Sequence, residues 1–235
     1  MEQQHHEPHT SKSISRLNSL RAAVLGANDG IVSVAGIVVG VAGATSSKSA
    51  IFTAGLAGLV AGSLSMAAGE FVSVSSQRDT ERVLLHNERL ELRDYPEQEL
   101  KELQGLYQAK GLSKQTAITV AKELTAKDAF SAHVDAELHI DPSDLTNPWQ
   151  AAVASAIFFL LGAVIPLITI ILVPARIRVV ITFFSVLVAL TLTGVLSAKV
   201  GGANKVKATL RVVLGGALAM TVTYSIGRLV GATVH

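Results

Sequence analysis

Five long apolar segments constrain this chain more than any other feature of its sequence. A run of about 18 or more apolar residues, at about 1.5 Å per residue, can cross the ~30 Å hydrocarbon core of a bilayer as a helix. Such runs predict five membrane-spanning helices, at about residues 20–44, 50–76, 149–173, 178–198 and 208–232. Only 16% of the residues are charged, whereas a soluble domain carries about a quarter. We therefore expect an all-α integral membrane protein.

The residues before the first span are polar and include three histidines. A signal peptide would instead begin with a basic segment and a short apolar core. The cluster of His5, His6, Glu7 and His9 either binds metal or belongs to a polar tail, and we favour a cytoplasmic tail over residues 1–19. Because the chain has no cysteine, disulfides and thiolate metal ligands are excluded.

Lysine and arginine are distributed unevenly between the two sides of the membrane. With the N-terminus inside, 16 of the 20 lie in cytoplasmic segments, and the other four are Lys48, Arg176, Arg178 and Arg228. Segments rich in these residues stay in the cytoplasm. We therefore expect the N-terminus and the long segment after the second span inside, and the C-terminus outside. The lack of a targeting segment favours a bacterial plasma membrane.

Residues 77–147 form a hydrophilic insert between the second and third spans. They hold 14 of the 18 acids and 9 of the 20 bases, so the insert carries −5 and the remainder +7. Its pattern predicts a helical cytoplasmic domain, with the second span continuing to about Arg93 and a break at Tyr95-Pro96, since proline disfavours helix in the residue before it. Three further helices are expected at about 97–109, 113–124 and 127–138.

Two acids fall inside predicted spans, Asp29 in the first and Glu70 in the second. A charge at mid-bilayer costs about 2.5–3.5 kcal/mol on insertion scales, so such residues normally carry out a function. Counted from the cytoplasmic ends, Asp29 lies about 13 Å deep, Met66 about 15 Å and Glu70 about 9 Å. We expect the three to line one cavity of a transport path. Alternatively, Glu70 only caps or snorkels, and Met66 only packs.

The insert contains two E-x-x-E pairs, Glu88 with Glu91 and Glu99 with Glu102. Residues at i and i+3 share a helix face, so each pair presents two carboxylates to one site. Glu81 lies on the same stripe as Glu88, and the break at Pro96 allows the two helices to pool their acids. The alternative is a solvated acidic face, because E-x-x-E alone is a weak signal.

His133 and Glu137, at i and i+4 on the last helix of the insert, are further candidate ligands, and Glu123 and Asp128 are weaker ones. A ferritin-like di-iron site needs E-x-x-H pairs from two helices, and the insert contains none. No Walker A motif for an ATP-driven pump and no nucleophile–base pair for an enzyme appears either. We expect no enzymatic activity, no prosthetic group and no nucleic-acid partner.

Glycines recur at small-xxx-small spacing in the spans, a pattern that lets helix backbones approach closely. The pairs are Gly26/Gly30, Gly36/Gly40, Gly58/Gly62 and Gly227/Gly231. They indicate either tight pairing of the first two spans or a dimer seam. Glycine is also commoner in membrane helices generally, which would explain the pattern without either.

Two segments carry a resemblance to a known family, NDGIVS at residues 28–33 and SLSMAAGE at residues 63–70. With the glutamate-rich helices and three closing spans, the chain resembles a bacterial-type member of the vacuolar iron transporter (VIT) family. The resemblance implies five spans, a homodimer and a metal-binding domain after the second span. It also implies export of Fe²⁺ or Mn²⁺ from the cytosol in exchange for protons.

The resemblance further implies roles for single residues. Asp29 and Met66 match the aspartate and methionine of the family's transport path, and the two E-x-x-E pairs match its metal-binding glutamates, with Glu137 carried over from the last helix. Gly58 departs from the plant pattern, which has a glutamate there, and Glu70 is a candidate substitute. The rivals are a membrane-anchored metal sensor or buffer, and a passive cation channel.

Overall fold

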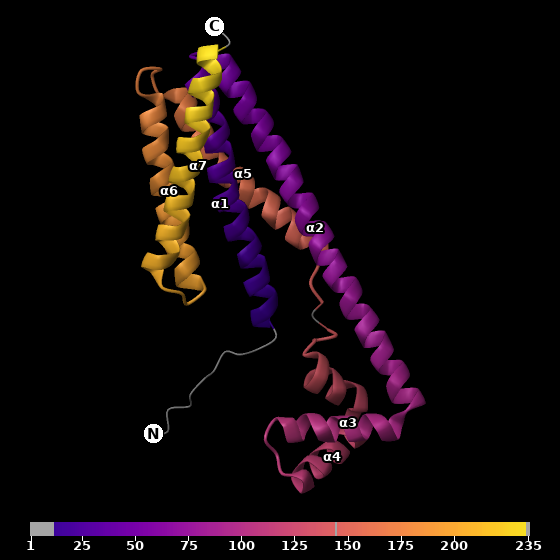
Figure 1. Ribbon diagram of the computed structural model, residues 1–235. Coiled ribbons are helices and arrows are strands. Elements are labelled where there is room, and N and C mark those ends of the chain that lie inside the picture. The colour runs from indigo at the N-terminus through magenta and orange to yellow at the C-terminus, as the bar shows by residue number, and fades with distance from the viewer. Residues whose placement is uncertain (1–11, 144, 234–235) are drawn as a thin grey trace, which may run out of the picture. The chain divides into compact units, whose positions relative to one another are not determined.

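The computed structural model describes residues 12–143 and 145–233, and every regular element among them is a helix (Figure 1). The predicted histidine-rich cluster at residues 5–9 lies outside the described residues. In order, the elements are α1 (Lys12–Ala44), α2 (Lys48–Asp94), α3 (Pro96–Ala109), α4 (Lys114–His133), the π-helix η1 (Val134–Leu138), α5 (Pro148–Leu172), α6 (Arg178–Val200) and α7 (Lys205–Thr233).

Five of these helices are long and apolar enough to cross a membrane, as the sequence predicts. Their spanning segments lie in Arg21–Ala44, Lys48–Asp94, Pro148–Leu172, Arg178–Lys199 and Lys205–Thr233. Large apolar side chains such as Leu172 (75% exposed) and Leu229 (69% exposed) point out of the bundle. Lipid, unlike water, solvates such side chains without cost. The protein is therefore an integral membrane protein.

The chain forms two compact units, which are described separately. Of the described residues, one unit comprises 16–72 and 148–233, and the other comprises 73–143 and 145–147 with residues 12–15. α2 contributes its apolar first part to the membrane unit and its charged last part to the helical unit. The expected continuation of the second span as a charged helix is thus observed, with its end at Asp94.

In the membrane unit, α1 packs backbone against backbone on α5. A Cβ atom added to Gly26 would lie 2.6 Å from the Ser155 carbonyl oxygen, and one added to Gly30 would collide with the Phe159 carbonyl. Gly162 on α5 lies equally close to the carbonyl of Ala27. Only glycine permits an approach of this kind.

The later glycines of α1 and those of α7 face each other. Gly40 and Gly43 approach Thr223 and Tyr224 of α7, and Gly227 approaches the Gly40 carbonyl. The expectation that small-xxx-small spacing pairs the first two spans is therefore wrong for these glycines, whose partners are α5 and α7. Gly58 of α2 does face α1, but there the neighbour is the side chain of Ile37.

The helical unit packs α3 against α4 and η1 around a small core of Leu103, Ala121, Ala132 and Ala136. Gly111 adopts a φ of +100° just after α3, a conformation that glycine takes without strain. Ser113 then caps α4, because its hydroxyl accepts a hydrogen bond from the Thr116 N–H.

Asp128 interrupts α4, where its φ of −165° and ψ of 97° lie outside the helical range. Its carboxylate accepts a hydrogen bond from the Ser131 N–H at 3.0 Å, which caps the segment that follows. The predicted break between two helices near residues 124–127 is therefore present, but at Asp128. The second segment ends in a turn of π-helix at Leu138, a form often found at functional sites.

Candidate metal site

The acidic residues of the helical unit come together because the chain reverses at Tyr95-Pro96. α2 ends at Asp94 and α3 begins at Pro96. The carbonyl of Tyr95 accepts hydrogen bonds from the N–H groups of Gln98 and Glu99, and so satisfies two first-turn donors of α3. The last turns of α2 and the first turns of α3 are thus held beside each other, with η1 and the end of α4 packed on α3.

His133 lies at the centre of the resulting cluster. Its imidazole is fully buried, and Nδ1 lies 3.2 Å from Glu88 Oε1, 3.6 Å from Glu99 Oε2 and 3.9 Å from Glu137 Oε2. The Glu88 and Glu99 side chains are 3% and 9% exposed. Three carboxylates from α2, α3 and η1 thus converge on one imidazole nitrogen.

These close approaches are not hydrogen bonds. Among the residues that the structure describes, neither Glu88 Oε1 nor either imidazole nitrogen of His133 has a hydrogen-bond partner. Buried polar atoms are normally paired, and each one left unpaired costs about 1–3 kcal/mol. A set of electron-pair donors that point at one another is the arrangement that a cation stabilises.

Two groups of three residues have ligand atoms within 4.8 Å of one another, and both contain Glu88. One is Glu88, His133 and Glu137, and the other is Glu88, Glu91 and Glu99. Carboxylate oxygen combined with imidazole nitrogen suits divalent first-row metals such as Fe²⁺ and Mn²⁺. The structure therefore brings together five of the predicted ligands from four different elements, α2, α3, α4 and η1.

Burial and mutual repulsion disfavour the charged form of these acids. The pKa of Glu88 is raised to about 7, first by burial and then by the charges of Glu137, Glu99, Glu91 and Glu102. Burial, followed by charge repulsion within the cluster, also raises the pKa of Glu99 and of Glu137. Near neutral pH, Glu88 therefore exchanges its proton easily.

The pKa of His133 is lowered, whereas the pKa values of the acids around it are raised. Burial lowers its pKa, and the charge of Glu102 offsets this only in part. The imidazole is consequently neutral at physiological pH and has a lone pair free for a metal ion. A cation that binds here meets negative charge and a neutral nitrogen donor, with Arg89 directed onto the ring of Phe130.

Other acids predicted as ligands lie outside the two groups. Glu81 accepts a hydrogen bond from Gln77 Nε2 at 2.9 Å, and Glu102 is exposed but raises the pKa values of its neighbours. Glu123 is exposed, and Asp128 caps a helix segment instead. A ligand role for Glu81 and Glu102 stays a prediction.

In the membrane unit, Asp29 is half-buried on α1, and its Oδ1 accepts a hydrogen bond from Ser33 Oγ at 2.8 Å. Met66 on α2 packs at the margin of the main core, and Glu70 is half-buried on the same helix. That these three side chains line one cavity stays a prediction.

A contact beside Asp29 was not expected from the sequence. The preceding residue, Asn28, accepts a hydrogen bond from Thr193 Oγ1 of α6 at 2.6 Å. Residues 26–30 are thereby held by the backbone of α5 at Gly26 and Gly30 and by the side chain of Thr193. An asparagine next to an intramembrane acid was the only sequence signal available for this contact.

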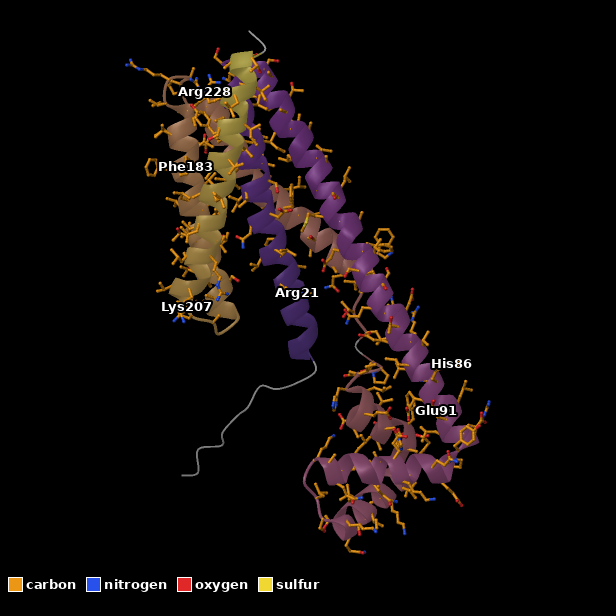
Figure 2. All side chains as sticks on the ribbon, viewed as in Figure 1. Arg21, His86, Glu91, Phe183, Lys207 and Arg228 are labelled. Carbon is orange, nitrogen blue, oxygen red and sulfur yellow. The ribbon has the colours of Figure 1, made fainter. Side chains whose placement is uncertain are left out.

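The fold and the cluster define a five-span membrane protein with a glutamate-rich helical insert that gathers metal-type ligands (Figure 2). Residues 20–228 match the model of the VIT family. The chain belongs to this family, as its first two spans indicate.

Curated relatives cover most of this chain. It is 44% identical to a vacuolar iron transporter of Acanthamoeba castellanii over 211 residues, which are 89% of this chain and 78% of the relative. It is 34% identical to vacuolar iron transporter homolog 2.1 of Arabidopsis thaliana, with 93% of this chain and 84% of the relative covered. Against vacuolar iron transporter homolog 1 of Oryza sativa the identity is 38%, with 93% and 76% covered.

The raised pKa of Glu88 predicts that the metal-free helical unit loses stability as pH rises. Between about pH 4.5 and 7 the folded state holds a proton that the unfolded state has released, so the free energy of unfolding falls through this window. Glu88→Gln removes this effect. We expect the free energy of unfolding of the variant to match that of the parent near pH 4.5 and to exceed it by up to about 3 kcal/mol at pH 8.

Hydrogen exchange of the α3 and α4 amides, in the full chain with a chelator present, measures this difference. Glu97→Gln, at an exposed position of α3, is the matched control and should follow the parent at every pH. An equal response of Glu88→Gln and Glu97→Gln would contradict the assignment.

Proposed function

We propose that this protein exports divalent iron or manganese from the cytosol across its membrane, in exchange for protons. The observation that carries the proposal is the convergence of Glu88, Glu99 and Glu137 on the buried, hydrogen-bond-free nitrogen of His133. Relatives that cover most of this chain are named vacuolar iron transporters, which supports iron as one of the ions.

The helical unit, on this proposal, collects the ion from the cytosol. The uneven distribution of lysine and arginine places this unit on the cytoplasmic side. Its acids have raised pKa values, so they release protons when a divalent ion arrives and recover them when it leaves. Raised pKa values make the cluster a reversible receptor, which suits a step that must hand the ion on.

Asp29, on the same proposal, is the carboxylate that carries the ion through the membrane, with Met66 as a soft sulfur ligand and Glu70 as a second acid. Ser33 orients the Asp29 carboxylate, and the contacts of Asn28 and Gly30 keep this stretch of α1 in position. Protons that return from the other side would displace the ion from these carboxylates and complete the exchange.

The two rivals make different demands on the same residues. A metal sensor or buffer needs the acidic cluster but assigns no role to Asp29, although placing Asp29 within the membrane costs free energy. A passive channel needs Asp29 but no proton exchange. We favour the transporter because it uses both sites.

We further propose that the protein works as a homodimer in the bilayer, which is the assembly that the resemblance to the VIT family implies. The names of the relatives refer to a vacuole, and they lend no support to a bacterial plasma membrane as the place of residence. The proposal that the N-terminus is cytoplasmic and the C-terminus is on the opposite side rests on the basic residues alone.

The metal site predicts that Glu88→Gln with Glu99→Gln weakens binding of Mn²⁺ by about 100-fold or more, because two buried ligands are lost together. Calorimetric titration of the full chain in detergent measures the change. The double variant Glu97→Gln with Asp79→Asn, at exposed positions of the same unit, removes the same charge and should bind as the parent does.

Equal weakening in both double variants would mean that the acids form only a solvated negative face. Under anaerobic conditions, the affinities of the parent and the two double variants for Fe²⁺ should rank as they do for Mn²⁺.

The transport path predicts that Asp29→Asn abolishes metal uptake into vesicles that contain the purified protein. The substitution keeps the shape of the side chain and removes its negative charge, so that Ser33 can still donate to the remaining oxygen. Metal binding by the helical unit should be unchanged, and this distinguishes a lost path from a lost fold. Undiminished uptake in the folded variant would refute the role of Asp29.

A further inference from the structure

A small cavity lies at the end of the membrane unit opposite to Asp29. It has a volume of about 230 Å³, and it is lined by the end of α1, the loop that follows, the start of α6 and Arg228 of α7. Helices α1 and α7 pack closely beside it. A Cβ atom on Gly43 would lie 2.8 Å from the Tyr224 carbonyl oxygen and 3.2 Å from the backbone nitrogen of Arg228. Figure 2 labels Arg228 near the end of α7.

Arg178, the first residue of α6, contributes a buried charge to this cavity. It is only 8% exposed, and in the part of the chain that the structure describes its Nε and Nη1 atoms have no hydrogen-bond partner. Isolated charges are almost never buried without a partner. Arg228 lines the same cavity, so two arginine residues border one small space.

The segments that form this end of the membrane unit carry no acidic side chain to neutralise these arginines. Residues 44–51, 172–182 and 224–235 contain no Asp or Glu. Asp29 lies 15 residues before Ala44 on α1, which is about 22 Å along the helix. Glu70 lies 22 residues after the start of α2, or about 33 Å along it.

The other polar groups around the cavity also favour an anion. Ile177 gives α6 no side-chain cap, so the first N–H groups of this 23-residue helix lack intrahelical partners and carry the positive end of its dipole. Thr45 and Ser46 add hydroxyl groups to the lining. The end of α1 supplies carbonyl groups, but the buried Nε and Nη1 atoms of Arg178 do not bond to them.

We propose that this cavity binds a phosphate group through Arg178 and Arg228. The guanidinium fork matches the oxygens of phosphate, and two such groups with a helix N-terminus suit a tetrahedral anion. Because α1 ends and α6 begins here, the site lies where a spanning helix meets the headgroup layer. The phosphate belongs either to a phospholipid headgroup or to a free inorganic ion. This site is independent of the metal-transport proposal.

The experiment uses the full chain in detergent, with two probes. Equilibrium dialysis measures binding of radiolabelled inorganic phosphate at constant ionic strength, and native mass spectrometry measures retention of short-chain phosphatidylglycerol against the matching diacylglycerol. Arg228→Gln and Arg178→Gln are the test variants. Arg176→Gln is the matched control, because Arg176 is exposed and does not line the cavity.

We expect the parent and Arg176→Gln to bind at least one phosphate-bearing probe, and Arg228→Gln to bind it about tenfold more weakly. Binding of inorganic phosphate would identify a free ion, whereas binding of phosphatidylglycerol alone would identify a headgroup. The proposal is overturned if neither probe binds, if diacylglycerol is retained as well as phosphatidylglycerol, or if Arg176→Gln weakens binding equally. Should Arg178→Gln fail to fold, Arg228→Gln decides the outcome.

Discussion

The cost of removing a charge from water governs every functional feature of this protein. Apolar runs long enough to span a bilayer leave room for few charges, and those that remain need a reason to be there. The acids of the helical unit, Asp29 in α1 and Arg178 at the start of α6 are each withdrawn from water to some degree. We propose that each meets a charged species that the protein binds or moves.

In the helical unit, the cost of removing charge from water is shared among acids from several helices. No single helix assembles the cluster; the reversal at Pro96 and the packing of α3 on α4 and η1 bring the acids to His133. The raised pKa of Glu88, about 7, keeps this acid partly protonated near neutral pH. On the proposed function, a cation must then displace a proton rather than water alone, which would link metal binding to pH.

The sequence predicted what depends on composition and local pattern. The five spans, the charged continuation of α2 and the break after Tyr95 follow from apolar run length and proline chemistry, and the structure contains all three. Membership of the VIT family followed from the motifs around Asp29 and Met66. These features need no knowledge of which helices touch.

What depends on tertiary contacts was predicted less well. Small-xxx-small spacing identifies a face for close approach but not the partner. The sequence left pairing with α2, a dimer seam and mere glycine frequency open, and the glycines of α1 face α5 and α7. Likewise, the spacing of His133 and Glu137 is visible in the sequence, but the burial of His133 depends on α2 and α3. The unpaired state of Arg178 required the fold as well.

The central claim is that metal crosses the membrane in exchange for protons, and a single measurement tests it directly. Purified protein is reconstituted into vesicles that hold a metal-sensitive and a pH-sensitive dye, and both signals are followed after metal is added outside. The account predicts that metal entry raises the internal pH and that an acidic interior accelerates entry. Metal entry with no change in internal pH, and at a rate independent of the pH gradient, would contradict it.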